Sequence, residues 1–237
     1  MNLLQRAARK ISRELMISRR KKDAKRLGIE FHEPNYIFLN TFNADSTVID
    51  VGCADDADFS VFMIDKMKLS SIGVDPTRKH ASALRALEQQ YAGKFRYLPV
   101  AVAATSGTLT FHESDHYASG SLIDSHMNMK RDSSTEYEVK AVTLRDLLRE
   151  IGVASADFIK LDLEGAEYDL LERTDAEEFK LFDQLFIEFH HHAFDQYSTD
   201  DTARLVRKIE NCGFTAFSLD DHNYLFYLKN GTANRTR

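Results

Sequence analysis

From about residue 45 onward the chain alternates short apolar runs, rich in β-branched residues, with stretches that are apolar at helical spacing. This alternation indicates parallel strands joined by crossover helices, because two parallel strands need a helix-length connection between them. The predicted strands are 47–51, 71–75, 94–102, 157–162 and 184–189. We therefore predict an α/β, Rossmann-like fold. It occupies one domain at 45–230, preceded by a basic helical N-terminal extension at 1–44 and followed by a disordered tail at 231–237.

Helix starts between these strands carry recognisable signals. Pro76, Thr143 and Ser198 stand where a first turn is expected, and proline and hydroxyl residues favour that position. The predicted helices run over 76–90, 144–151 and 199–211. Antiparallel pairs are expected at 108–112 with 137–142 and at 214–219 with 224–228. The polar, serine-rich stretch 113–135 is expected to be a mobile insertion.

Charge is divided unevenly along the chain. Residues 1–30 hold ten Lys or Arg and three acidic residues, a net charge of +7, so the overall charge of −6 leaves −13 on the remainder. Apolar residues recur in this arm at helical spacing, at Leu4, Ala8, Ile11 and Leu15. The arm therefore predicts a basic amphipathic helix that lies solvated on its own acidic domain or makes weak contact with a membrane surface or a partner. No specific nucleic-acid partner is predicted.

Cysteine usage and hydropathy bear on the compartment. The chain has two cysteines, Cys53 and Cys212, which form neither a disulfide framework nor a zinc-binding pair of the CxxC type. Arg6, Arg9 and Lys10 interrupt the apolar stretch that a secretory leader needs near the N-terminus. We therefore expect a cytoplasmic protein.

Acidic residues gather where the predicted strands end. Asp75 ends the second strand, Asp162 and Glu164 follow the fourth, and Glu188 ends the fifth. In open α/β sheets, ligands bind at the carboxyl ends of the strands. An acid about 25 positions after the first strand end can accept hydrogen bonds from both hydroxyls of a ribose, and Asp75 has this position.

The loop after the first strand argues against a dinucleotide. A pyrophosphate site needs G-x-G-x-x-G, whereas this loop places Asp55, Asp56 and Asp58 where phosphates would lie. Like charges at such distances repel by several kcal/mol in a low-dielectric site. A cationic adenosyl ligand is favoured instead, and S-adenosylmethionine combines an adenosine with a sulfonium and an ammonium group.

Several motifs together resemble the FkbM family of S-adenosylmethionine-dependent methyltransferases over roughly residues 45–228. They are V-I-D-V-G at 48–52, G-V-D-P at 73–76, G-T-L-T-F at 107–111, K-L-D-L-E-G-A-E at 160–167 and I-E-F-H at 187–190. The resemblance implies a class I methyltransferase fold with a mostly parallel seven-stranded sheet and an antiparallel last strand. It also implies O-methylation of a hydroxyl on a carbohydrate or secondary metabolite.

The resemblance also guides the predicted cofactor contacts. These are Asp50, Gly52, Cys53, Asp55, Asp75 and Asp162. The family loop usually reads D-x-G-A-N-x-G, and the second glycine is absent here, with Asp55 or Asp56 near its place. A non-glycine residue with positive φ there would cost on the order of 1 kcal/mol.

Catalysis by such an enzyme requires loss of a proton from the acceptor hydroxyl, and a carboxylate or histidine can take it. We predict Glu188 or His190 for proton removal, with Asp162 and Glu164 organising the site. Lys160 shares a strand face with Asp162 and is expected to pair with an acid and lower its pKa.

Two alternatives remain. Glu188, His190 and His192 could project together as metal ligands, but consecutive histidines after a strand are more often solvated, so no metal is predicted. The chain could also be a non-catalytic domain of the same fold, tethered by its N-terminal helix to a membrane, nucleic acid or partner.

Overall fold

The computed structural model describes residues 3–32, 36–115, 120–123 and 133–228. The tail predicted at 231–237 lies outside these residues, as does most of the predicted mobile insertion.

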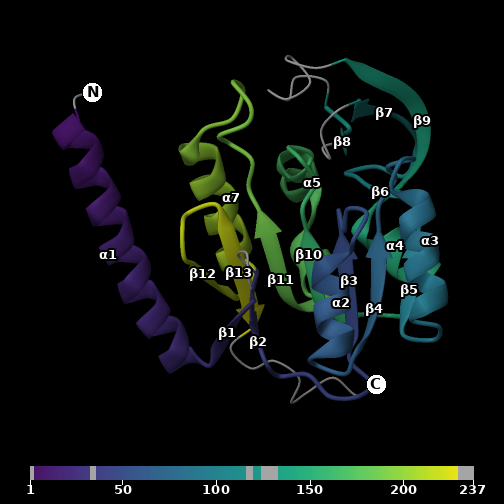
Figure 1. Ribbon diagram of the computed structural model, residues 1–237, viewed down its shortest axis with the longest axis horizontal. Helices are drawn as coiled ribbons and strands as arrows, with labels where there is room; N and C mark the ends of the chain where they lie inside the picture. The colour runs from purple at the N-terminus through teal and green to yellow at the C-terminus, as the bar shows by residue number, and fades with distance from the viewer. Residues whose placement is uncertain (1–2, 33–35, 116–119, 124–132, 229–237) are drawn as a thin grey trace.

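The main sheet has seven strands in the order β12-β13-β11-β10-β3-β4-β5. In chain order they are β3 (Thr47–Val51), β4 (Ser70–Val74), β5 (Phe95–Leu98), β10 (Ala156–Leu161), β11 (Phe182–Glu188), β12 (Phe214–Ser218) and β13 (Asn223–Leu228). All neighbouring strands pair in parallel except β13, which is antiparallel to β11 and β12. The predicted class I methyltransferase fold, with its antiparallel last strand, is therefore confirmed (Figure 1).

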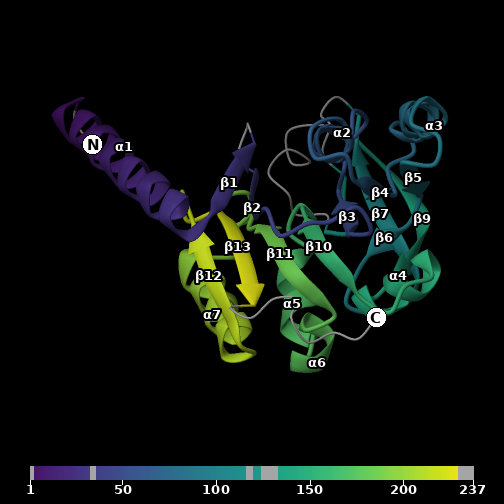
Figure 2. The same ribbon diagram turned by 90° about the horizontal axis from the view of Figure 1, so that it is seen from below.

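Helices cover both faces of this sheet (Figure 2). They are α2 (Asp58–Asp65), α3 (Ala81–Gln90), α4 (Leu144–Ile151), α5 (Glu167–Arg173), α6 (Ala176–Phe179) and α7 (Thr199–Asn211). Alternate residues of each strand point to opposite faces, so Ile159 packs with α4, α5, α6 and α7, whereas Phe158 packs with α2. This alternation is why the strands buried on both faces read as continuous apolar runs in the sequence.

A smaller sheet has the order β6-β9-β7-β8 and lies at one end of the main sheet (Figure 1). Its strands are β6 (Ala101–Val102), β7 (Gly107–Ser114), β8 (Gly120–Ser121) and β9 (Ser134–Val142). The predicted antiparallel pair is confirmed as β7 with β9. The predicted single strand at 94–102 is wrong. It divides at Pro99 into β5 and β6, which belong to different sheets, since proline cannot donate to a continuing ladder.

Helix ends follow the sequence signals in two of three cases. The Thr143 hydroxyl accepts the Asp146 N–H before α4, and Ser198 and Asp201 form a reciprocal capping box before α7. The third helix was predicted to open at Pro76, but α3 begins at Ala81. The cause is local: the Asp75 carboxylate accepts the Thr77 N–H and holds the intervening residues in a turn.

The N-terminal segment contributes α1 (Leu3–Leu27) and the antiparallel pair β1 (Ile29–His32) and β2 (Tyr36–Leu39). Ile37 and Phe38 are fully buried in the core beside α2. α1 reaches away from the domain, and its buried residue Ala24 lies close to β1 (Figures 1 and 2). Among the described residues, no helix combines the length and the apolar character needed to cross a bilayer.

Candidate functional site

A cavity of about 150 Å³ opens at the carboxyl ends of β3, β4 and β10. The chain continues from β3 to β4 and β5 on one side of the sheet, and from β10 to β11 on the other, so the strand order reverses between β3 and β10. Ligands of open α/β sheets bind at such a reversal. The lining residues that concern the site are Gly52, Ala54, Asp75, Thr77, His80, Phe111, Gly120, Leu122, Asp162 and Glu164.

Gly52, which directly follows β3, packs against the backbone of Asp162, which directly follows β10. Its φ is +72°, and a Cβ there would lie 1.9 Å from the backbone oxygen of Asp162. No other residue fits, because both the dihedral angle and the close approach exclude a side chain. Gly52, a predicted cofactor contact, is thus required both for packing and for its backbone conformation.

Further along the loop, the positive φ values fall on alanines. Ala54 has φ 56° and Ala57 has φ 43°, while Asp55 and Asp56 have no positive φ. The prediction that an aspartate would replace the missing glycine is therefore wrong. Each alanine in this conformation costs roughly 1–2 kcal/mol, and one of them is held by the hydrogen bond from the Ala54 N–H to Asp75.

Three of the predicted cofactor residues do not line the cavity. Asp50 is fully buried and accepts hydrogen bonds from the N–H and hydroxyl of Ser60, so it anchors the start of α2. Cys53 is buried among apolar side chains, and this burial raises the pKa of its thiol well above the usual value. Asp55 is exposed to solvent.

Asp75 lines the cavity and is almost completely buried. One carboxylate oxygen accepts the Ala54 N–H at 3.0 Å and lies 3.3 Å from His80 Nδ1, and the other accepts the Thr77 N–H at 2.8 Å. Burial alone would raise the pKa of Asp75, but the hydrogen bond and charge of His80 and the hydrogen bonds of Thr77 lower it. Asp75 is thus held ionised, with acceptor capacity left on one oxygen.

Lys160 ties the two sides of the strand reversal together. Its ammonium donates to the Gly52 carbonyl at 2.9 Å and lies 3.3 Å from Asp50 Oδ1 and 3.4 Å from Asp162 Oδ2. Burial would lower the pKa of Lys160, yet the charges of Asp50 and Asp162 raise it well above its ordinary value. The predicted pairing with an acid is therefore present, and Lys160 remains a buried cation.

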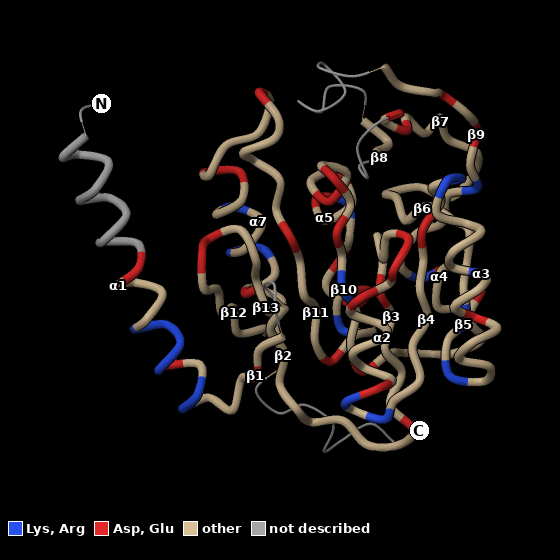
Figure 3. The backbone as a smooth tube through the Cα atoms, in the orientation of Figure 1, with Lys and Arg blue, Asp and Glu red and all other residues tan. Residues whose placement is uncertain are grey.

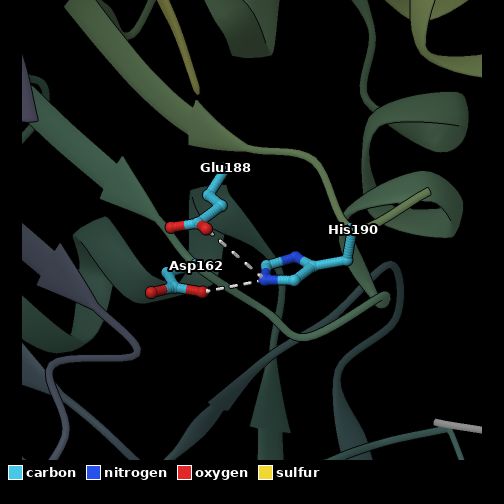
Figure 4. A group of neighbouring side chains, drawn as sticks. All are labelled: Asp162, Glu188 and His190. Atoms are coloured by element: carbon cyan, nitrogen blue, oxygen red, sulfur yellow. Dashed lines mark ion pairs between the residues drawn. The ribbon is translucent and has the colours of Figure 1, made fainter. Parts of the chain in front are cut away.

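Four carboxylates, that of Asp162 included, surround the imidazole of His190. Its Nε2 lies 3.5 Å from Asp162, 3.7 Å from Glu164 and 4.0 Å from Glu188 (Figure 4). On the other side, Nδ1 lies 3.2 Å from the fully buried Glu167. The predicted catalytic residues Asp162, Glu164, Glu188 and His190 are thus brought together by the ends of β10 and β11.

This crowding shifts the pKa values of His190, Glu188 and Asp162. Burial alone would lower the pKa of His190, but the charge and hydrogen bond of Glu167, with Asp162 and Glu164, raise it to about 10. Burial and the nearby charge of Asp162 raise the pKa of Glu188 to about 7. Burial also raises the pKa of Asp162 despite Lys160 and His190, so the predicted lowering by Lys160 is outweighed. His190 is therefore a fixed cation at neutral pH, and Glu188 can gain or lose a proton there.

Metal-ligand atoms are close together in the same cluster. One ligand atom each from Asp162, Glu188 and His190 lies within 4.8 Å of the others. The predicted alternative set was Glu188, His190 and His192, so the observed group has Asp162 in place of His192. His192 stacks on His190 with ring centroids 6.0 Å apart. The raised pKa of His190 places a positive charge beside the carboxylates of Asp162 and Glu188.

The small sheet lines one side of the cavity through Phe111 of β7 and Gly120 of β8. The Ser121 hydroxyl donates to the Glu164 carbonyl at 2.7 Å, and Gly120 packs directly on the Phe111 ring. Glu164 itself has a φ of 49°, a strained conformation for a residue with a side chain. The small sheet therefore contacts the acidic loop after β10.

The family of the chain follows from its sequence match. The family described as "Methyltransferase FkbM domain" matches residues 19–216. The chain belongs to the FkbM methyltransferase family. Its cofactor is accordingly S-adenosylmethionine, as the sequence predicted. No curated protein matches the chain.

Solved structures similar to this FkbM methyltransferase share little sequence with it. The fibrillarin/Nop5p complex has 10% identity and a TM-score of 0.45, over 78% of this chain and 73% of that chain. M. capricolum TrmK in complex with S-adenosyl-homocysteine has 10% identity and a TM-score of 0.42, over 81% and 65%. The N-terminal domain of human METTL16 with the same compound has 10% identity and a TM-score of 0.43, over 76% and 60%. The match thus spans less than two thirds of the TrmK and METTL16 chains.

The cavity of the FkbM domain fits a positively charged, phosphate-free adenosyl cofactor. Among the residues that the structure describes, its lining contains no lysine or arginine, and the one histidine there, His80, already faces Asp75. The acidic residues of this lining are Asp75, Asp162 and Glu164, and the last two also lie beside His190. This donor set would repel a phosphate and attract a sulfonium or an ammonium group.

Sequence reasoning missed several residues of this site. Glu167 was seen only as the last acid of its motif, yet it orients His190 through both the imidazole and the backbone N–H. His80, Thr77 and Ala54 fix Asp75. The available signal was the spacing of Thr77 and His80, two and five residues after a predicted strand-end acid.

Proposed function

We propose that this methyltransferase transfers a methyl group to a hydroxyl of a carbohydrate or secondary-metabolite acceptor, with Glu188 removing the hydroxyl proton. The supporting observation is Glu188 itself, a partly exposed carboxyl at the end of β11 whose pKa is raised to about 7 by burial and by Asp162. A general base works best when its pKa is near the operating pH. Of the two residues predicted for proton removal, Glu188 fits this role better.

Bound S-adenosylmethionine supplies an electrophilic methyl group on a positively charged sulfur. Asp75 has one carboxylate oxygen with capacity left for a ribose hydroxyl, and Gly52 lines the same cavity at the end of β3. Asp162 and Glu164 would face the positive groups. These residues bind and orient, which is most of what an in-line displacement needs.

The acceptor's proton then goes to Glu188. The oxygen–methyl bond forms as the sulfur–methyl bond breaks, and the carboxyl of Glu188 holds the released proton. His190 does not act as the base in this scheme, because its pKa is raised to about 10 and it stays protonated. Its positive charge instead attracts the carboxylates of Asp162, Glu164 and Glu188, each of which lies within 4.0 Å of the His190 Nε2 atom.

The choice of a hydroxyl acceptor rests on the chemistry of the cluster. Ionised carboxylates only accept hydrogen bonds, and those of Asp162, Glu164 and Glu188 are each about a quarter exposed. A polyhydroxylated small molecule or glycan offers several donors to such a surface. The small sheet with Phe111 and Leu122 would supply the apolar wall. The proposed compartment is the cytoplasm, and the pattern of two cysteines without CxxC spacing supports it.

The test has two stages with the full chain. Calorimetry should first detect S-adenosylmethionine and S-adenosylhomocysteine binding, because a non-catalytic domain that has lost the cofactor would bind neither at millimolar concentration. Labelled methyl transfer to matched hydroxyl and amine acceptors of the same carbon skeleton should then favour the hydroxyl series. Binding of the cofactor with transfer only to amines would contradict O-methylation and leave the family activity intact.

A further inference from the structure

All three large hydrophobic side chains that are exposed in the described part of the chain lie near the N-terminus. Leu15 is 60% exposed, Leu27 is 50% exposed and Phe31 is 38% exposed. Leu15 and Leu27 belong to α1, and Phe31 belongs to β1, which packs against the end of that helix. Isolated exposed leucines need no explanation, but their confinement to one segment does.

The same segment carries a concentration of positive charge. Between residues 19 and 26 there are six basic residues and one acid. The basic residues are Arg19, Arg20, Lys21, Lys22, Lys25 and Arg26. All but Arg20, which pairs with Asp221, are exposed. Figure 3 shows these blue positions in the half of α1 nearest the domain, while red positions are frequent over the sheet and its other helices.

α1 is also free to present this surface. It reaches out from the domain in both ribbon views, with Ala24 buried near β1 (Figures 1 and 2). Toward its N-terminus, the sequence continues the apolar spacing at Leu4, Ala8 and Ile11, between further arginines and lysines. Exposed apolar residues interleaved with cations on one helix are typical of helices that lie in a membrane interface.

We propose that α1 with Phe31 docks this methyltransferase on an anionic lipid bilayer. The cations pair with lipid phosphates and carboxylates, and Leu15, Leu27 and Phe31 enter the boundary between headgroups and acyl chains. The acidic remainder of the chain is repelled by the same surface, so the protein binds through its N-terminal segment. A nucleic acid would match the charge but would leave the exposed apolar side chains unused.

The test is co-sedimentation of the full chain with vesicles of phosphatidylcholine alone or with about one third phosphatidylserine. We expect binding to the phosphatidylserine vesicles that weakens as salt rises, and little binding to the neutral ones. The double variant Lys21→Glu, Lys22→Glu should bind at least about tenfold more weakly, since each basic residue near the surface contributes severalfold. Leu15→Ser should also weaken binding, and this loss should persist at low salt.

The matched control is Lys66→Glu with Lys94→Glu, the same change of charge at two exposed lysines outside the N-terminal segment. This control should bind vesicles like the unaltered chain, and all variants should bind S-adenosylmethionine equally if they are folded. Equal binding to neutral and anionic vesicles, or full binding by the Lys21/Lys22 variant, would overturn the proposal. So would a dimer seen by light scattering without lipid that the same variant dissociates, because α1 would then bind a second copy.

Discussion

Two carboxylates at the same edge of the main sheet differ in protonation behaviour. Asp75, after β4, accepts the backbone N–H groups of Ala54 and Thr77 and faces His80, and its pKa is lowered. Glu188, at the end of β11, lies partly buried near Asp162, and its pKa is raised to about 7. Both are largely removed from water, so burial alone does not decide the outcome.

The difference comes from what each carboxylate faces. Donors from the backbone and an imidazole stabilise the ionised form of Asp75, whereas Glu188 lies near an acid and shares one imidazolium with several others. The first arrangement suits a residue that binds, and the second suits a residue that exchanges a proton at neutral pH. In the proposed function, the sheet edge therefore has a binding end at Asp75 and a reactive end at Glu188.

The strongest test of the reactive end is Glu188→Gln. The amide keeps the size of the side chain but cannot take a proton, so kcat should fall by about 10²–10⁴-fold while S-adenosylmethionine affinity stays unchanged. Single-turnover methyl transfer and calorimetry measure the two quantities. Glu138→Gln, an exposed acid on β9, is the control for loss of charge. Full activity of Glu188→Gln would contradict the assignment of Glu188 as the base, and with it the proposed difference between Asp75 as a binding residue and Glu188 as a reactive one.

The pH dependence of the unaltered enzyme is a second test of the assignment of Glu188 as the base. Because the base must be ionised, activity should be present above pH 7 and fall about tenfold for each pH unit below it. His190 stays protonated until about pH 10, so it adds no second change in the neutral range. A kcat profile that is flat from pH 5 to 8 would contradict the assignment of Glu188.

At the binding end, Asp75→Asn should weaken S-adenosylmethionine binding by about tenfold or more. The amide nitrogen cannot accept the hydrogen bonds that one carboxylate oxygen accepts now, so the loop at Ala54 or the turn at Thr77 loses its anchor. Calorimetry measures the affinity. With cofactor saturating, kcat should change little, and a large fall in kcat at saturation would mean that Asp75 takes part in the reaction.

The smallest expected effect is that of metal removal. Since the His190 imidazolium supplies the positive charge between Asp162 and Glu188, treatment with a chelator should leave methyl transfer unchanged. Activity before and after dialysis against the chelator, with elemental analysis of the protein, measures this. Activity that is lost and then restored by a divalent cation would show that an ion, rather than a proton, holds these side chains together.

Much of the fold could be predicted because its signals are local. The strand predicted at 47–51 matches β3, because its apolar run is followed by Gly52, whose positive φ ends the strand. The helix after Ser198 carries its own capping box. The split at Pro99 could not be predicted from apolarity, because β6 pairs with β9, some forty residues later in the chain. The predicted domain boundary at residues 44 and 45 stays a prediction.

Some residues of the candidate site could likewise be predicted from the sequence, whereas others could not. Asp162, Glu164, Glu188 and His190 could be grouped from the sequence, because parallel strand order brings their carboxyl ends together. Cys53 and Asp55 could not be placed, because their directions depend on the turns at Gly52 and Ala54. Glu167 looked like an acid in a first helical turn, a common stabilising position. Its role depends on His190, which only the folded chain brings near it.

At Gly52 the loop after β3 lies so close to the backbone of Asp162 that no side-chain atom fits between them. A methyl group at position 52 would push the loop after β3, which contacts the proposed cofactor site, away from the acidic loop after β10. Affinity and turnover would then decline together, so a single substitution at position 52 would disturb both carboxylate sites at once.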